Sequence, residues 1–353
     1  MGKDCEASRM AFGKEAVNIA RDERGMALLI TIMTVSLLVA ITVQFHKTTW
    51  HKYQISSNYK IGGRLKVIAD SGVNIGLALL EQDGTENTFD SLLDSWIVAE
   101  QEDFSDLFVG GQLQLNIDDL TGRLQVNSLV RKSEKSEDQE KDKILEEEMR
   151  AIFMRLLLSG SFPVEDEVEA RTIVDSLVDW IDEDDRESDD GAESSYYQSF
   201  ENPYSCRNGP VQYIEELLLV RGITRSLLFG TKDSRGLADY LTVHGETGKI
   251  NINTAPDLVL QSLHSLVSDE MVENLEMYRT DIDNQESLAD ISWYRSSDGW
   301  PGDIDFEEGL LTTVSSHFRI TAVGEFDTYT RKVVALAERA EEGEIRLLGR
   351  KVE

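Results

Sequence analysis

The densest set of residues able to do chemistry is an acidic run at residues 182–193, which reads DEDDRESDDGAE and holds eight carboxylates in twelve positions. Carboxylates packed this closely repel one another, and a hard cation such as Ca²⁺, with about six to eight oxygen ligands, would relieve that repulsion. The run is not an EF-hand loop, because Arg186 stands in the third acidic position and Glu187 stands where the glycine belongs. The residues alone leave two interpretations open, a cation site and a solvated acidic loop.

No pattern of catalytic residues accompanies this run. The histidines show no H-E-x-x-H or other metal-ligand spacing, and no G-x-S-x-G nucleophile motif occurs. Cys206 lies in the turn-rich stretch NPYSCRNGP with no base beside it in sequence. Carboxylate pairs of the glycosidase kind are too plentiful either to identify or to exclude. We therefore expect a protein that is not an enzyme.

The composition indicates an ordered globular chain with a strongly acidic surface. Of 353 residues 41% are apolar and 29% are charged, and 66 acidic against 35 basic residues leave a net charge of −31. Such a surface repels phosphate backbones and favours cations or basic protein patches, although solubility alone is a competing explanation. Because Cys206 is the only cysteine besides Cys5, no framework of disulfides within the chain can form.

The element that locates the chain is an uncharged apolar run, MALLITIMTVSLLVAITVQF, from Met26 to Phe45. As a helix rising about 1.5 Å per residue it covers roughly 30 Å, the thickness of the hydrocarbon core of a bilayer. No small-residue cleavage site follows it, so it differs from an ordinary secretory signal. Instead Gly25 precedes it, which resembles a type IV prepilin leader. The resemblance implies cleavage by a prepilin peptidase between Gly25 and Met26 and methylation of the new amino terminus.

The elements that must position these residues follow from hydrophobic spacing. Residues 53–80 continue the helix, with Gly62 and Gly63 expected to bend or loosen it. Residues 111–127 alternate around a D-L-T-G turn and predict a two-stranded hairpin, and residues 316–340 show the same alternation. Helical spacing predicts further helices at 144–158, 168–181 and 211–220.

Two short motifs repeat within the chain. GRLQVN at 122–127 and GKININ at 248–253 share the pattern G-[RK]-apolar-x-apolar-N, and each precedes a helix–turn–helix stretch. After the second motif, Asn253 or Thr254 is expected to cap a helix that has Pro256 in its first turn.

The leader, these motifs, the acidic run and the closing SSHFRITAVGEF together resemble the minor pseudopilin K subunits of bacterial type II secretion systems, over nearly the whole chain. The resemblance implies an α+β fold in which a long, pilin-like N-terminal helix packs on an antiparallel sheet that carries a large α-helical insertion of SAM-like or helix-hairpin-helix repeats. The implied parts are a prepilin leader (1–25), a transmembrane helix (26–45), the first part of a pilin-like domain (46–129), an α-helical inserted domain (130–312) and the last strands with a tail (313–353).

The same resemblance implies a structural role at the tip of the pseudopilus. The subunit would work with the minor pseudopilins I, J and H, and help to start or cap assembly or contact secreted substrates. Most pilins carry Glu as the fifth residue after the cut, whereas this chain has Ile30. A subunit without that buried carboxylate need not find its partner below it, which favours a tip position. K subunits bind calcium in the acidic region, and the candidate ligands are Asp182, Asp184, Asp185, Asp189 and Glu193.

The expected location is the inner membrane, crossed once, with the N-terminus in the cytoplasm and the bulk in the periplasm. Flanking charges do not decide this orientation, because Arg21 and Arg24 on one side are matched by Lys47 and Lys52 on the other. The orientation therefore rests on the leader.

Two other functions compete with this interpretation. One is a minor pilin of a type IV pilus, which co-purification with partners I and J would distinguish. The other is a membrane-tethered helix-hairpin-helix DNA-binding protein. Its hairpin would be LHSLVSDEM, which lacks a glycine and places Asp269 and Glu270 where a phosphate would lie. We therefore expect no nucleic acid partner.

Overall fold

The computed structural model describes residues 23–102, 104–131, 139–232, 234–245, 247–340 and 343–353. It comprises two compact units, Met1–Gly63 and Arg64–Glu353. Apart from Glu23 to Gly25, the predicted leader lies outside the described residues.

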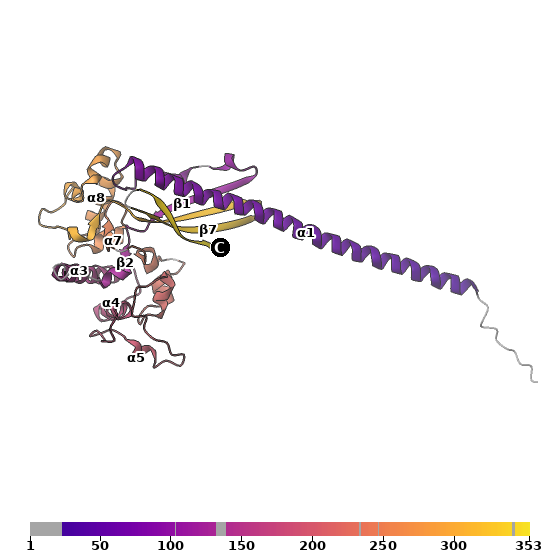
Figure 1. The fold of residues 1–353 in the computed structure, drawn as a ribbon, viewed down its shortest axis with the longest axis horizontal. Helices are drawn as coiled ribbons and strands as arrows, with labels where there is room; N and C mark the ends of the chain where they lie inside the picture. Colours follow the sequence, from indigo (N-terminus) through magenta and orange to yellow (C-terminus); the bar gives the residue numbers. More distant parts are fainter. Residues whose placement is uncertain (1–22, 103, 132–138, 233, 246, 341–342) are drawn as a thin grey trace, which may run out of the picture. The chain divides into compact units, whose positions relative to one another are not determined.

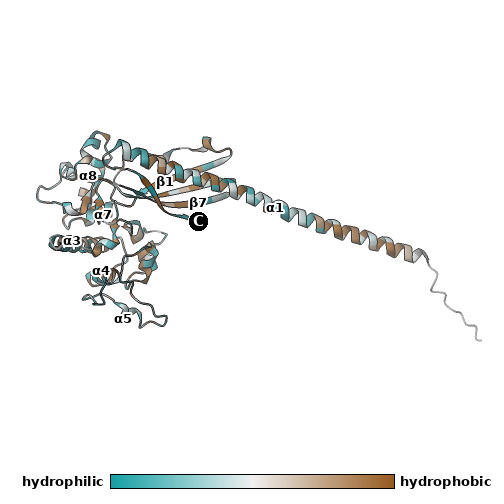
Figure 2. Cartoon of the chain, viewed as in Figure 1, coloured by the Kyte–Doolittle hydropathy of each residue, from teal (hydrophilic) through white to brown (hydrophobic). Residues whose placement is uncertain are grey.

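Helix α1 (Glu23–Glu86) provides all the described structure of the first unit. Residues 25–56 are exposed throughout, and the apolar stretch stands out in Figure 2. Within it the hydroxyls of Thr31, Thr34 and Thr42 donate to carbonyls three or four residues earlier, at 2.8–3.0 Å. Their polar groups are thus satisfied inside the helix, as a hydrocarbon environment requires. Among the described residues, α1 is the helix that is long enough and apolar enough to cross a bilayer.

In the second unit, the later part of α1 packs on a four-stranded antiparallel sheet (Figure 1). The strands are β1 (Gly111–Asp119), β6 (His317–Phe326), β7 (Tyr329–Arg339) and β8 (Ile345–Val352), in the order β1-β6-β7-β8. The helix lies close to the sheet at two glycines. A Cβ added to Gly72 would lie 2.6 Å from Leu113 Cδ1, and one added to Gly76 would lie 2.8 Å from Ile320 Cγ2. Small residues at these two positions let the helix backbone approach the strands.

Alternating burial along the strands creates the core beneath this helix. On β1, for example, Leu113, Leu115 and Ile117 are buried while Gln112 and Gln114 are exposed. These side chains join Phe318, Ile320, Val333 and others of β6 and β7 in one apolar cluster with α1. The predicted alternation at 316–340 is confirmed as β6 and β7.

The predicted hairpin at 111–127 is wrong. Strand β1 pairs with β6, so that Asp118 lies opposite Arg319, 201 residues later in the sequence. After Asp119 the chain turns away, because the Asp119 carboxylate accepts the Thr121 N–H at 2.7 Å. Strand β2 (Leu124–Gln125) then pairs in parallel with β3 (Leu241–Thr242) in a separate two-stranded sheet.

The chain between β1 and β6 forms a largely helical region. Its longer helices are α3 (Gln139–Leu157), α4 (Glu167–Ile181) and α8 (Asp269–Thr280), and α3 and α4 confirm two of the predicted helices. The stretch predicted as a helix at 211–220 contains the 3-10 helix η5 (Ile214–Leu219) instead. The remaining elements of the region are η4 (Val126–Leu129), α5 (Ser194–Tyr197), α6 (Arg225–Phe229), η6 (Leu237–Asp239), β4 (Ile250–Asn251), α7 (Asp257–Ser262), η7 (Ile282–Ala289), η8 (Trp293–Ser296), η9 (Glu308–Leu310) and β5 (Leu311–Thr312). Between α1 and β1 lie α2 (Ser95–Val98), η2 (Ala99–Gln101) and η3 (Ser105–Leu107).

The two repeated motifs occupy equivalent structural positions. Each forms a two-residue strand in a parallel pair, β2 with β3 and β4 with β5. The asparagine that ends each motif then bridges distant segments. Asn127 donates to the Val211 and Val243 carbonyls, both at 3.0 Å, and accepts from the Val211 N–H at 2.7 Å. Asn253 likewise donates to two carbonyls and accepts from an indole N–H.

This use of Asn253 explains why the predicted helix cap is wrong. Its amide donates to the Asp90 and Leu288 carbonyls and accepts from Trp293 Nε1, and so it is not available to the helix. The Thr254 hydroxyl donates to Asp119. Helix α7 therefore starts after Pro256, which is itself the N-cap, and no side chain caps the helix.

Candidate metal site

Three carboxylates of the acidic run meet where α4 ends and α5 begins. Asp182 is the C-cap residue of α4, and Glu193 is the N-cap residue of α5. One oxygen from each of Asp182, Asp184 and Glu193 lies within 4.8 Å of the others. The helix ends thus bring together residues that are separated by an exposed loop in sequence.

Several buried acceptors in this region have no donor. Asp182 Oδ1, Glu193 Oε1 and Asn208 Oδ1 are all buried without a hydrogen-bond partner. Asn208 reaches the group from another segment, since its Nδ2 donates to the Asp184 carbonyl at 3.0 Å and to Asp185 Oδ1 at 3.2 Å. A buried acceptor left unpaired costs about 1–3 kcal/mol, which a cation with oxygen ligands would offset. The residues therefore fit a calcium ion.

The electrostatics of the group point the same way. Burial, followed by repulsion from Asp184 and Asp179, raises the pKa of Asp182 to about 6. Burial, the main cause, also raises the pKa of Glu193 to about 7, with the neighbouring carboxylates Asp179, Asp182 and Asp185 adding to it. Arg150 opposes the rise at Asp182 without cancelling it, and a bound cation would reverse both shifts.

Asp179 fixes the loop that carries these ligands. It is fully buried, and its carboxylate accepts the Ser188 N–H at 3.1 Å and the Ser188 hydroxyl at 2.5 Å. A Cβ on Gly191 would collide with the same carboxylate, so only glycine fits there. Arg221 Nη1 donates to the Gly191 carbonyl at 2.8 Å and holds the far side of the loop.

The structure therefore brings together part of the predicted ligand set. Asp182, Asp184 and Glu193 form the group, Asp185 is engaged by Asn208, and Asp189 is exposed and lies outside the group. Asn208 and Asp179, which also shape the group, were not among the predicted site residues. The only local signal for Asn208 is the turn-forming pair Asn208-Gly209, consistent with its left-handed φ of 50°.

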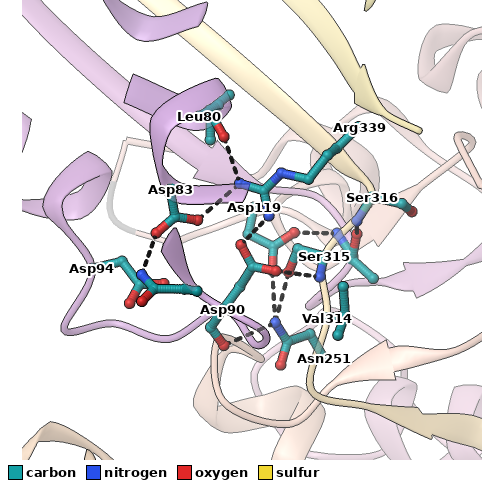
Figure 3. A network of polar contacts seen from close by, with 12 residues as sticks. Leu80, Asp83, Asp90, Asp94, Asp119, Asn251, Val314, Ser315, Ser316 and Arg339 are labelled. Atoms are coloured by element: carbon teal, nitrogen blue, oxygen red, sulfur yellow. Dashed lines mark hydrogen bonds and ion pairs between the residues drawn. The ribbon is translucent and has the colours of Figure 1, made fainter. Parts of the chain in front are cut away.

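A second acidic group, Asp83, Asp90 and Asp94, is buried where α1 ends (Figure 3). It already holds a cation of the chain itself. Arg339, from the end of β7, makes ion pairs with Asp83 Oδ2 at 2.8 Å and with Asp90 Oδ1 at 2.5 Å. Burial raises the pKa of Asp90 to about 7, and Arg339 opposes that rise. A metal ion would compete with the guanidinium, so this group is an internal salt bridge.

The same network joins the helical region to the sheet. The Asp90 carbonyl accepts from Asn251 Nδ2 at 3.3 Å, and Asp90 Oδ2 accepts the Ser315 N–H at 2.7 Å. The Ser315 hydroxyl and Thr254 donate to Asp119 at the end of β1. The end of α1, the ends of β1 and β7 and the helical region therefore meet at one buried polar cluster (Figure 3).

The described part of the chain contains one cysteine, Cys206, and two neighbouring histidines that could be considered for catalysis. Cys206 is buried, its Sγ donates to the Asp179 carbonyl at 3.2 Å, and burial raises its pKa to about 12, so that it is not a thiolate at neutral pH. His244 and His317 stack at 6.4 Å between ring centroids. Burial, aided by His317, lowers the pKa of His244.

The residues predicted to take part in processing (Gly25 and Met26) and in assembly (Ile30) lie in the exposed part of α1. Gly25 has no neighbouring atom within 4 Å of an added Cβ, and the side chains of Met26 and Ile30 are 62% and 58% exposed. Cleavage after Gly25 stays a prediction.

Comparison with known proteins agrees with this architecture. A family model described as type II secretion system, protein K, matches residues 122–230. The chain is 24% identical to the type II secretion system protein K of Pseudomonas aeruginosa over 348 residues, which cover 94% of this chain and 93% of the relative. It is 27% identical to a putative type II secretion system protein K of Escherichia coli K12 over 58% of this chain and 60% of that protein.

A solved structure shows the same fold. A chain in the crystal structure of the GspK-GspI-GspJ complex from the enterotoxigenic Escherichia coli type 2 secretion system matches with a TM-score of 0.63 and 18% identity, covering 85% of this chain and 99% of that chain. The predicted α+β fold is thereby confirmed. The family matches do not favour a type IV pilin or a DNA-binding protein. The chain is similar to type II secretion protein K subunits over nearly its whole length, and these matches support the prediction of a minor pseudopilin of a type II secretion system.

Proposed function

We propose that this minor pseudopilin is the tip subunit of the pseudopilus, anchored in the inner membrane with its bulk in the periplasm and assembled with minor pseudopilins I and J. The related crystal structure, a GspK-GspI-GspJ complex, supports these partners. The work of the subunit is structural, since it starts or caps the filament.

The helical region between β1 and β6 is the observation that carries the tip position. It joins the sheet at the end where α1 terminates, as the contacts of Asp90 with Asn251 and of Arg339 with Asp83 indicate. A subunit inside a filament must leave both ends of its domain free for neighbours. A large folded region at one end prevents stacking there.

Ile30 supports the same position. A carboxylate at the fifth residue of a mature pilin helix is costly in the membrane unless it is paired with the amino terminus of a neighbour. An isoleucine there removes the need for that neighbour. The subunit can then be the first to leave the bilayer.

Two measurements test this proposal. Full-length chain co-expressed with I and J in the inner membrane should co-purify with both after detergent extraction. Absence of both partners from the purified chain would refute the tip assembly. The mass and N-terminal sequence, with and without prepilin peptidase, should give a chain that starts at a methylated Met26 only when the peptidase is present. A Gly25→Val variant is the matched control and should keep its leader, and an intact leader in the parent chain would refute processing.

We also propose calcium as the ligand of the site formed by Asp182, Asp184 and Glu193, with Asn208 Oδ1 as a further oxygen. The unpaired acceptors and the raised carboxylate pKa values support this assignment. A bound ion would supply positive charge that fixes the end of α4 to the start of α5. It would thereby order the exposed loop between the two helices.

A further inference from the structure

The anchor helix continues into a stretch whose charge contrasts with the rest of the molecule. From Met26 to Ala69 the sequence contains no Asp or Glu, although the chain has 66 acidic residues. The same stretch carries the cations Lys47, Lys52, Lys60, Arg64 and Lys66. A protein with a net charge of −31 thus presents a basic surface directly beyond its membrane-spanning segment.

Aromatic side chains accompany the first of these cations. Trp50 and Tyr53 stack with ring centroids 6.2 Å apart and an angle of 29° between the rings. They are 53% and 67% exposed, and with His46 they follow a spacing of four and three residues, which places them on one face of α1. Trp and Tyr on the surface of a helix, next to an apolar span, are typical of the membrane–water interface.

The helix geometry places this cluster at the headgroup layer. At about 1.5 Å per residue, Lys47 lies roughly 3 Å and Lys52 roughly 10 Å beyond Phe45 along the helix axis. The headgroup region is roughly 5–8 Å thick on each side of the hydrocarbon core, and a lysine side chain can extend back toward it. If Met26–Phe45 spans the core, Lys47, Trp50 and Lys52 all reach lipid phosphates.

These cations are also free to bind a ligand. Within the described part of the chain, Lys47, Lys52 and Lys60 make no ion pair, in contrast to Lys66, which pairs with Asp70 at 2.5 Å. An acidic helix of a neighbouring subunit could also satisfy them, but such a helix would have to enter the headgroup layer to reach Lys47. Anionic lipid is already present there.

We infer that residues 46–53 of α1 form a binding surface for anionic phospholipid headgroups, with Lys47 and Lys52 pairing with phosphate and Trp50 and Tyr53 at the interface. The inference rests on the membrane anchor of the proposed function. It adds a consequence for assembly, because the subunit must exchange these phosphate contacts for other contacts when it leaves the bilayer.

Lipid selectivity of the full-length chain in vesicles tests this inference. The chain is reconstituted in mixed phosphatidylglycerol–phosphatidylcholine vesicles, and electron spin resonance measures the association of spin-labelled forms of each lipid with the protein. At low salt we expect several-fold stronger association of phosphatidylglycerol than of phosphatidylcholine. The preference should fall toward unity in about 0.5 M salt, because screening weakens exposed charge pairs.

Lysine variants separate this surface from general charge effects. The variant Lys47→Gln/Lys52→Gln should lose the preference. The matched control, Lys232→Gln/Lys249→Gln, removes exposed lysines of the second unit and should keep it. Equal association of the two lipids with the parent chain, or a preference unchanged in the Lys47→Gln/Lys52→Gln variant, would overturn the inference. A parent chain that alkaline carbonate releases from the vesicles would instead refute the membrane anchor itself.

Discussion

Replacing Arg339 by methionine should destabilise the second unit strongly and in a pH-dependent way. The Arg339 side chain is 7% exposed, and its partners Asp83 and Asp90 are 1% exposed. Its guanidinium also donates to the Leu80 carbonyl at 3.0 Å and lies 4.8 Å from the Phe318 ring centroid. Methionine keeps much of the apolar stem but leaves two buried carboxylates without a countercharge.

The magnitude follows from that burial. Removing one partner of a buried ion pair costs about 3–5 kcal/mol, because the remaining charge stays buried and unpaired. We therefore expect the free energy of unfolding to fall by about 3–5 kcal/mol at pH 8. Arg346→Met is the matched control, since Arg346 and its partner Glu344 are 62% and 71% exposed, and such surface pairs contribute at most about 1 kcal/mol.

The sign of the pH dependence can be worked out from Asp90. Its folded pKa of about 7 lies above its ordinary value of 3.8, so ionising this group costs stability as the pH rises between those values. Loss of Arg339 removes the charge that opposes this rise, and the pKa of Asp90 moves higher still. The destabilisation relative to the parent chain should therefore be larger at pH 8 than at pH 5.5, where Asp90 is protonated in both folded proteins.

Urea denaturation followed by tryptophan fluorescence is a suitable assay, because Trp96 packs edge-on against Phe318 in the same core, with centroids 5.5 Å apart. The double variant Arg339→Met/Asp90→Asn should recover part of the lost stability, since it removes one unpaired carboxylate. A single variant within 1 kcal/mol of the parent at pH 8, or a cost that grows on acidification, would refute the reasoning.

Three further predictions concern the helix–sheet contact, the metal site and the repeated asparagines. Gly76→Val should lower the free energy of unfolding by about 1–3 kcal/mol, because the added side chain would crowd Ile320. The control Gly63→Ala lies in the same helix but meets open space, and it should not lower the free energy of unfolding. Equal urea midpoints for the two variants would contradict this prediction. Calcium should raise the melting temperature of the parent chain and of the Asp189→Asn variant. It should raise the melting temperature of the Asp182→Asn/Glu193→Gln variant much less. Calcium affinity measured by calorimetry should fall from pH 8 to pH 5, because protons compete for groups with pKa values of about 6 and about 7; a pH-independent affinity would argue against these ligands. Asn253→Ala should cost about 2–4 kcal/mol in urea denaturation, because two carbonyls and the Trp293 indole lose their partners. Gln112→Ala, at an exposed position of β1, is the control and should stay within about 0.5 kcal/mol.

Patterns that are local in sequence predicted the elements well. The uncharged run from Met26 to Phe45 and the alternation over 316–340 correspond to the exposed part of α1 and to β6 and β7. Pairing between distant segments could not be predicted this way. The D-L-T-G sequence has the appearance of a hairpin turn, yet the partner of β1 lies beyond the entire helical region.

The candidate site shows the same division. Its acidic character is visible in the sequence, but the choice among carboxylates depends on where α4 ends and α5 begins, which brings Glu193 beside Asp182 and leaves Asp189 outside. Asn208 reaches the group from 24 residues away in sequence, through contacts that no local pattern encodes. Asn253 was expected at a helix cap, whereas tertiary contacts with Asp90 and Trp293 engage its side chain.

The pairing of β1 with β6 has a consequence for the order of folding. Strand partners such as Asp118 and Arg319, 201 residues apart, give the sheet a high contact order, and closing so long a loop is slow and entropically costly. If the helical region folds first, it brings its own two ends together and shortens the effective loop. Until that happens β1 presents an unpaired edge, which is prone to pair with other chains. Early folding of the helical region would therefore protect a newly synthesised chain from aggregation.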